Sequence, residues 1–314
     1  MKRLSVIVPT LLISFTLTGC SLVSNLLGGG SKSEPKFENK GEQVTALQYS
    51  KELSEAVKDS KFYYDSKTHL ESLTTNVSAY TKQTNKVDDN GTKTEGSTEM
   101  TGKMVLKYNA NALVANQTTD VSYTMKSKNS YGSQSGTTKI AQDSTIQISK
   151  HELYTINNKA KTYTETSISD TMSDEEVMDQ RVGSSLSSVM TVTIAGYSEK
   201  DITYYVNGKV FTYVIDYSDS EDLTNWNSEK VGRRETTVKM TYQMNLNEGK
   251  YSVKSSSKQT RHTEYTKDYN DYSAGAVEDI NSVSYGTATI KFGSVKLEAK
   301  SLSGYTKIQN DYYY

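Results

Sequence analysis

Hydrophobic and polar residues alternate along most of this 314-residue chain. From Met100 to Tyr108 the even positions are apolar or small, and lysine or threonine occupies most of the odd positions. A similar alternation recurs in residues 113–126 and 238–246. Because successive side chains of a strand point to opposite faces, this period of two predicts a sheet with one apolar face.

Short turn sequences separate these strand patterns, and Asn-Gly in particular favours a tight hairpin. The clearest turn sequences are Asp88–Gly91, Asn157-Asn158, Asn207-Gly208 and Asn247–Gly249. Further strand patterns run over residues 202–217 and 283–299, the latter with a break near Gly293. The sequence therefore predicts antiparallel strands that are joined by hairpins.

Two segments have helical periodicity instead. Residues 42–60 repeat apolar side chains at near-helical spacing. A second helix is predicted from Ser173, because Ser173 and Glu176 form a capping-box pattern and acidic residues suit the positive end of a helix. Its apolar stripe consists of Val177, Met178, Val182, Leu186, Val189 and Met190.

These elements predict an α+β fold that is mostly antiparallel β. We expect a one-sided sheet packed against a few amphipathic helices. A single large β-rich domain over residues 41–314 accounts for the length. A helix followed by strands occurs twice, so a two-half duplication with a boundary near 170–200 stays open.

The N-terminus has the features of a secretory signal peptide. Lys2 and Arg3 precede an apolar run that is too short for a membrane-spanning helix, and small residues stand directly before Cys20. The segment Leu17-Thr18-Gly19-Cys20 resembles the lipobox of bacterial lipoproteins. This resemblance implies removal of residues 1–19, acylation of Cys20 and attachment to the extracytoplasmic side of the bacterial cell membrane. An ordinary secreted protein with a coincidental cysteine is the alternative.

Residues 20–40 are predicted to be a flexible tether behind the lipidated cysteine. Gly28, Gly29 and Gly30 are followed by polar residues and by Pro35. A coil of about 20 residues has a mean reach of roughly 25 Å, which would hold the domain close to the membrane.

Charge and cysteine content exclude several classes of function. The net charge of the chain is −1, and removing Lys2 and Arg3 with the signal peptide makes it −3. No nucleic-acid partner is expected, because nucleic-acid-binding domains are basic. Cys20 is the only cysteine, so the mature domain has neither a disulfide nor a cysteine-ligated zinc.

Motifs for catalysis or metal binding are incomplete. The three histidines, His69, His151 and His262, are far apart in the sequence, and Thr155 stands where a zinc-protease motif starting at His151 needs its second histidine. Gln134 occupies the serine position of a nucleophile elbow. We therefore expect no enzymatic activity, no cofactor and no metal, although distant acids could still gather in space.

Methionine is the apolar residue that draws most attention. Several methionines lie on the apolar sides of the predicted strands and second helix, and methionine suits surfaces that accept varied apolar partners. The simpler alternative is that they fill an ordinary core. If sheet and helices instead enclose a cavity for acyl chains, methionines would line it. The candidate cavity residues are Met100, Met104, Met125, Met178, Met190, Met240 and Met244.

The order of elements over residues 42–300 resembles the LolA/LolB-like and LppX/LprG-like lipid-binding lipoproteins. This resemblance implies a curved one-sided sheet or half-barrel. It also implies a lipid or other amphiphile held between sheet and helices by a non-enzymatic binding module. An alternative from another class is an interaction or sensor protein that recognises wall glycan or another envelope protein. Its candidate contact residues are Tyr265, Tyr269, Tyr272 and Trp226.

Overall fold

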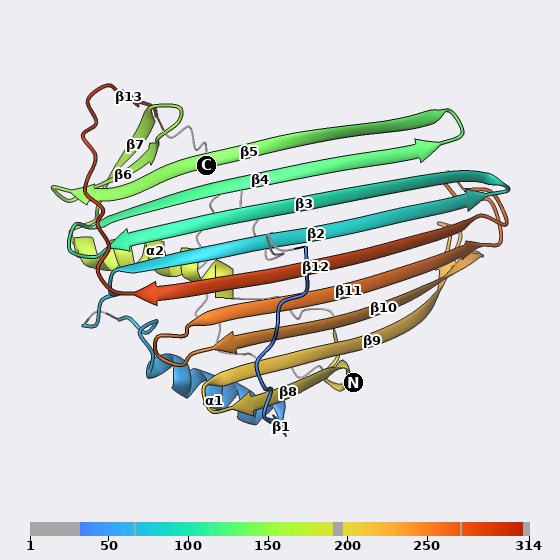
Figure 1. Ribbon diagram of the computed structural model, residues 1–314, viewed down its shortest axis with the longest axis horizontal. Helices are drawn as coiled ribbons and strands as arrows, with labels where there is room; N and C mark the ends of the chain where they lie inside the picture. The colour runs from blue at the N-terminus through green and yellow to red at the C-terminus, as the bar shows by residue number, and fades with distance from the viewer. Residues whose placement is uncertain (1–31, 66, 191–196, 271, 310–314) are drawn as a thin grey trace.

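The computed structural model describes residues 32–309 except 66, 191–196 and 271 (Figure 1). Within this part, one open sheet of 13 strands has the order β1-β8-β9-β10-β11-β12-β2-β3-β4-β5-β6-β7-β13. All neighbouring strands are antiparallel except β7 and β13. The strands are β1 (Glu42–Val44), β2 (Leu73–Asp89), β3 (Thr92–Asn109), β4 (Val114–Asn129), β5 (Gly132–Ser149), β6 (Glu152–Asn157), β7 (Thr162–Ser167), β8 (Ile202–Asn207), β9 (Val210–Thr224), β10 (Lys230–Asn245), β11 (Ser252–Tyr265), β12 (Val277–Phe292) and β13 (Thr306–Lys307). The predicted α+β, mostly antiparallel class is confirmed.

The two helix-then-strand segments of the sequence share this sheet. Strand β12 pairs with β2 along its whole length, from Val277 opposite Asp88 to Phe292 opposite Leu73. The two-residue turn Asn90-Gly91 joins β2 to β3, and both residues have positive φ, 51° and 89°. Strands of 14 to 18 residues make the central part of the sheet unusually long.

Both helices lie on one face of the sheet, at the same end of the long strands (Figure 1). Helix α1 is Ala46–Lys58, with Thr45 as its N-cap. The periodicity of the sequence predicts that this helix starts at residue 42, and this prediction is wrong. Residues 42–44 instead form β1 and pair with β8, so that an edge of the sheet captures them.

Helix α2 is Asp174–Met190, and the capping box predicted at its start is confirmed. The Ser173 hydroxyl accepts a hydrogen bond from the Glu176 N–H at 3.1 Å, and the Ser173 N–H donates to the Glu176 carboxylate at 2.8 Å. These two bonds satisfy backbone groups that the first turn of a helix leaves unpaired.

Two apolar clusters fill the space between sheet and helices. Under α1, Tyr49 packs edge-on against Phe211, with 5.7 Å between the ring centroids. Under α2, Met178 and Val182 are fully buried with Tyr108 and Leu73. Only one face of each strand enters these clusters, as the alternation predicted.

The opposite face of the sheet is polar and is crossed by two extended segments (Figure 1). We call residues 32–41 the N-terminal strap and residues 293–305 the C-terminal strap. The face is identified by alternation, because Gln243 and Asn245 on β10 contact the N-terminal strap while Tyr242 and Met244 lie in the cluster under α1. We call this surface the strap face and the other the helix face.

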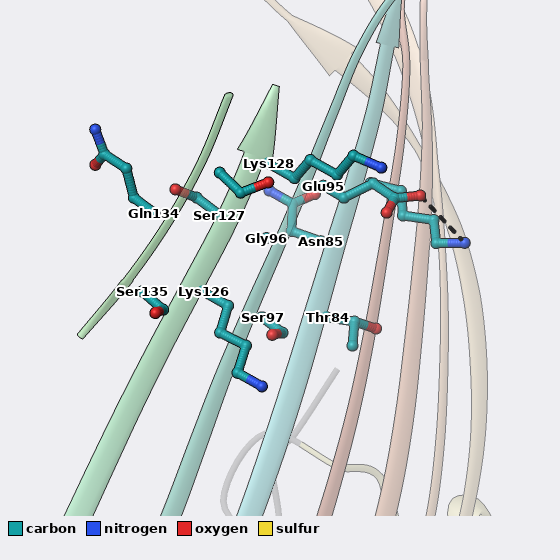
Figure 2. Close-up of a pocket in the computed structure, with 12 residues that line it drawn as sticks. Thr84, Asn85, Glu95, Gly96, Ser97, Lys126, Ser127, Lys128, Gln134 and Ser135 are labelled. Carbon is teal, nitrogen blue, oxygen red and sulfur yellow. Dashed lines mark ion pairs between the residues drawn. The ribbon is translucent and has the colours of Figure 1, made fainter. Parts of the chain in front are cut away.

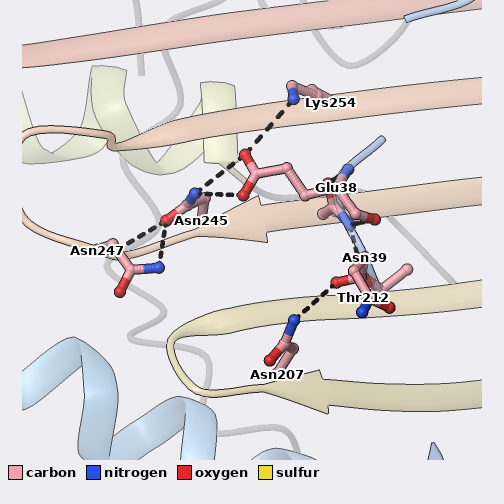
Figure 3. Close-up of polar contacts among 8 residues, drawn as sticks. Glu38, Asn39, Asn207, Thr212, Asn245, Asn247 and Lys254 are labelled. Carbon is pink, nitrogen blue, oxygen red and sulfur yellow. Dashed lines mark hydrogen bonds and ion pairs between the residues drawn. The ribbon is translucent and has the colours of Figure 1, made fainter. Parts of the chain in front are cut away.

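The N-terminal strap is held by hydrogen bonds to buried side chains of the sheet (Figure 3). The Glu38 N–H donates to Gln243 Oε1 at 2.7 Å, and Gln243 Nε2 donates to the Glu38 carbonyl at 3.1 Å. Asn245 Nδ2 lies 3.0 and 2.9 Å from the two Glu38 carboxylate oxygens. The expectation of a flexible tether is therefore wrong for residues 32–40, because sheet side chains far away in the sequence, such as Gln243 and Asn245, bind this segment.

The C-terminal strap replaces the last part of the strand pair predicted over 283–299. Strand β12 ends at Phe292, and the following residues cross the sheet instead of pairing along it. Asn109 Nδ2 donates to the Leu297 carbonyl at 2.8 Å, and Gln147 exchanges two hydrogen bonds with the Lys300 backbone at 3.0 and 2.7 Å. These side-chain contacts satisfy backbone groups that a strand would pair.

Candidate functional site

A groove lies on the strap face, at the end of the strands away from the helices. Its volume is about 490 Å³, and the four adjacent strands β2 to β5 form it (Figure 2). It is lined by Thr84, Asn85, Lys86, Glu95, Gly96, Ser97, Lys126, Ser127, Lys128, Ser133, Gln134 and Ser135.

The strand register places the charged residues of this groove on the strap face. On β4, Ala115 belongs to the cluster under α2, so Lys126 and Lys128, at an odd spacing from it, point the other way. On β2, Val77 belongs to the helix-face core, so Lys86 also points to the strap face. The alternation therefore brings three lysines from two hairpins onto one concave surface.

The groove is locally basic although the chain is slightly acidic. Glu95 is its only carboxylate, and the Glu95 carboxylate lies 3.9 Å from Lys86 Nζ. No described residue forms an ion pair with Lys126 or Lys128. Thr84, Ser97, Ser133 and Ser135 add hydroxyl groups on the strap face, whereas Asn85, Gly96, Ser127 and Gln134 alternate to the helix face. Such a surface offers cations and hydrogen bonds but no apolar contact.

The N-terminal strap begins at the edge of this groove. Lys32 Nζ lies 2.6 Å from Glu99 Oε1, and Glu99 is two residues from Ser97 on the same face of β3. The hydrogen bond from Lys32 lowers the pKa of Glu99, and the positive charges of Lys82 and Lys126 lower it further. Glu99 therefore stays ionised and keeps the start of the strap beside the groove.

A second polar cluster adjoins the groove across the β12–β2 pair. His262 Nδ1 lies 2.7 Å from Asp279 Oδ1, and His262 Nε2 lies 3.3 Å from Glu264 Oε1. Asp279 stands opposite Lys86 in the register. The hydrogen bond with Asp279, and then the one with Glu264, raises the pKa of His262.

The tyrosines predicted as ligand contacts mostly contact one another. The rings of Tyr265 and Tyr272 stack at 4.4 Å with 9° between their planes, and Tyr269 stacks on Tyr265 at 6.4 Å. The Tyr272 hydroxyl donates to Glu278 Oε1 at 2.9 Å, and burial together with this bond raises the pKa of Tyr272 to about 12. These rings close the β11–β12 loop onto the sheet.

The most exposed aromatic side chains are at two other hairpin tips. Trp226, the only tryptophan, is 92% exposed in the β9–β10 loop, and Tyr131 is 96% exposed between β4 and β5. A turn organised by Asn225 holds Trp226, since Asn225 Oδ1 accepts from the N–H groups of Asn227 and Glu229 at 3.0 Å. Trp226 is therefore presented to solvent by an ordered loop.

The structure does not gather the seven predicted methionines around either described hollow. Met178 and Met244 are buried, Met104, Met190 and Met240 pack partly buried against the core, and Met100 is half-buried. Met125 is 54% exposed. A hollow beneath α2 has a volume of about 30 Å³, which holds roughly one or two water molecules. Leu106 and Val182 line it, but no methionine does.

Each histidine has its own acidic partner, and the three pairs lie apart. His69 Nδ1 is 2.7 Å from the buried Asp179, and His151 Nδ1 is 2.8 Å from Asp174. Among the described residues, no group of three or more histidine, cysteine or acidic side chains could hold a metal ion. The Gly132–Gly136 segment, in which Gln134 occupies the serine position of a nucleophile elbow, is part of β5 and contributes Ser133 and Ser135 to the groove.

The predicted signal peptide and Cys20 lie outside the described residues. No described helix is long and apolar enough to cross a membrane.

Sequence reasoning missed the groove. The available signal was lysine at 126 and 128 and serine at 133 and 135, spaced by two on either side of the turn at residues 130 and 131. This spacing places all four side chains on one face of a hairpin. Lys86 and Ser97 could not have been added, because they come from another hairpin.

Comparison with known proteins gives no family for this chain. No protein-family model matches it, and no curated protein matches it. The structure of OccK7 (OpdD) from Pseudomonas aeruginosa aligns at 6% identity and a TM-score of 0.22, covering 70% of this chain and 99% of that chain. The low-pH structure of Pseudomonas putida OprB aligns at 6% identity and a TM-score of 0.23, covering 81% and 100%. Similarities this low carry no argument.

Proposed function

We propose that this protein is a lipid-anchored, non-enzymatic binding protein of the bacterial cell envelope whose groove binds an anionic, hydroxyl-rich polymer. The observation that carries the proposal is the groove itself, whose strap-face side chains are three lysines, one carboxylate and the hydroxyls of serine and threonine. A chain of phosphates and hydroxyls, such as a polyol phosphate, complements both the charge and the hydrogen-bonding groups.

The proposed anchor would keep this groove near the membrane. Lys32 is the twelfth residue after Cys20, and it pairs with Glu99 beside the groove. Twelve residues span at most about 43 Å when fully extended. Acylation of Cys20 would therefore present the strap face to polymers close to the membrane surface.

Binding of a polyol phosphate tests this proposal. The probe is poly(glycerol phosphate), with neutral dextran as the control polymer, measured by isothermal titration calorimetry on the chain from Ser21 onward. That chain retains every described residue. We expect binding that weakens with added salt, because the lysines are exposed and their charges are screened.

A pair of lysine variants locates the site. Lys126→Gln with Lys128→Gln removes two exposed charge contacts, which are worth up to about 1 kcal/mol each, so affinity should fall by roughly tenfold. The matched control replaces Lys51 and Lys250, which are exposed at the other end of the strands, and should change affinity by less than about twofold. Equal binding of dextran, or no effect of the groove variant, would refute the proposal.

The second candidate is the amphiphile carrier that the sequence predicted. The observation in its favour is that Met125 and Ile140, 54% and 51% exposed, lie on the helix face where neither helix covers β4 and β5. A sheet that curled into a half-barrel would bring this surface around an acyl chain. Native mass spectrometry of the same chain separates the two candidates, because a co-purified lipid would favour the carrier.

A further inference from the structure

One long edge of the sheet has no partner among the described strands. Strand β5 pairs with β4 from Gly132 to Gln147, but β6 pairs with β5 only from Ser144 onward. Residues 132–142 therefore form an outer edge that no described strand covers, and every side chain in this stretch is exposed. Figure 1 shows this part of β5 along the border of the sheet, beyond β6 and β7. We call residues 132–142 the open edge.

The backbone groups of the open edge that point outward can be assigned. Gly132 closes the two-residue hairpin with Asn129, so the even residues of β5 bond to β4 and the odd residues point away. The Asp143 carbonyl follows this rule, because it accepts from the Asn158 N–H at 2.9 Å on the outer side. The outward N–H and C=O groups belong to Ser133, Ser135, Thr137, Lys139 and Ala141.

The open edge lacks the features that normally prevent strand pairing. It contains no proline and, in residues 132–142, one charged side chain, Lys139. Natural sheets usually protect such an edge with several charges, a proline, a bulge or a covering segment.

The opposite border of the sheet is protected in that way. Strand β8 covers β9 only as far as Ile215, and β9 continues uncovered to Thr224. The uncovered part carries four acids in nine residues, namely Asp216, Asp219, Glu221 and Asp222. Like charges along this edge disfavour the approach of a second β9 edge.

We propose that the open edge pairs with the open edge of a second copy of this chain, in the antiparallel direction. A second copy is the partner that the structure supports, because the two borders of the sheet differ. If β5 met β9 of another copy, pairing would continue from copy to copy into a filament, whereas β5 with β5 closes after two copies. The acids of β9 disfavour pairing of β9 with a second β9, which leaves β5 as the border that can pair with its own copy.

A two-fold axis at Thr137 satisfies the geometry. The antiparallel register then sets Ser135 opposite Lys139 of the second copy and Ser133 opposite Ala141, so that only outward-pointing residues exchange hydrogen bonds. No two lysines face each other. The pairing would also bring Lys139 of each copy beside Ser135 of the other, which lines the groove.

Sedimentation of the chain from Ser21 onward tests the proposal. We expect twice the chain mass at a concentration of about 100 μM. Thr137→Lys places two lysines across the axis and should give a monomer. Thr137→Pro is a second variant, because it removes an outward N–H and leaves the β4–β5 hydrogen bonds intact. The matched control is Ser218→Lys on the outer edge of β9, which should stay dimeric.

Far-UV circular dichroism and urea unfolding of each variant show whether it is folded. Dimeric wild type and control, together with folded monomeric variants at position 137, support the pairing. A wild-type monomer at this concentration overturns it, even if the monomer takes up an extended peptide. A dimer that survives both substitutions at position 137 overturns it as well.

Discussion

Truncation of Met178 separates the core interpretation of the methionines from the cavity interpretation. Met178 is 0% exposed on α2 and packs among Leu73, Tyr108 and Val182. Met178→Ala removes three heavy atoms from a filled cluster, and substitutions of this kind cost about 2–5 kcal/mol. Helix propensity does not offset the loss, because the propensities of methionine and alanine differ by only about a few tenths of a kcal/mol. We expect a loss of about 3 kcal/mol, which lowers Tm by roughly 6–12 °C.

The matched control is Met125→Ala, at a position that is 54% exposed. It should change the free energy of unfolding by less than about 0.5 kcal/mol. Urea unfolding should be followed by far-UV circular dichroism, because Trp226 is 92% exposed and its fluorescence reports little of the core. The m-values of the two variants must agree if their unfolding free energies are to be compared.

A cost of less than about 1 kcal/mol for Met178→Ala, or one no larger than that of Met125→Ala, contradicts the filled-core interpretation. A side chain that lines an empty acyl-chain cavity has few partner atoms to lose in the absence of lipid. A small cost would therefore place Met178 at a cavity wall instead of in a filled core.

Three further changes test the strap, α2 and the polar cluster beside the groove. Gln243→Ala leaves the N–H and C=O of Glu38 without partners and should lower the free energy of unfolding by about 1–3 kcal/mol. Hydrogen exchange in residues 32–41 should become faster. Unchanged exchange there would show that other contacts hold the strap. The methyl group of Gly183→Ala would overlap the phenol ring of Tyr64 and should destabilise the protein by about 1 kcal/mol. In a Tyr64→Ala background the same change should stabilise α2, because alanine favours a helix more than glycine does. A double-mutant cycle in which the effect of Gly183→Ala on the unfolding free energy keeps its sign contradicts this account. His262 has a raised pKa in the folded state, so its contribution is complete below about pH 6.5 and is lost as pH rises through the higher folded value. Wild type should therefore be more stable than His262→Gln at pH 6, by urea unfolding, and the difference should shrink toward pH 9; a difference that grows with pH has the wrong sign.

Local elements followed from the sequence with few errors. The capping box at Ser173 and the hairpin turn at Asn90-Gly91 depend on neighbouring residues, so short-range chemistry was sufficient to predict them. The predicted start of α1 at residue 42 is wrong, because residues 42–44 pair with β8, which is more than 150 residues away. The end of the last strand pair was misjudged for the same reason, since Asn109 and Gln147 hold the C-terminal strap.

The candidate site was less predictable than the elements that form it. The sequence of each strand predicts which of its residues share a face, but it does not predict which strands are neighbours in the sheet. Lys86 and Lys126 line the same groove because β2, β3 and β4 are neighbours in the sheet. Long-range strand pairing determines that order. The methionines illustrate the reverse error, because a shared apolar character on several strands does not show whether they surround a cavity or fill a core.

By itself, the sequence determined the period of the strands, their turns, the two helices and a start that resembles a lipoprotein signal. Those properties depend on residues within a few positions of one another. The tertiary structure decided that residues 32–40 bind the sheet, that the basic groove lies beside Lys32, and that β5 has an open edge. Each of these depends on which distant segments are adjacent, and the free energy of that arrangement belongs to the whole fold.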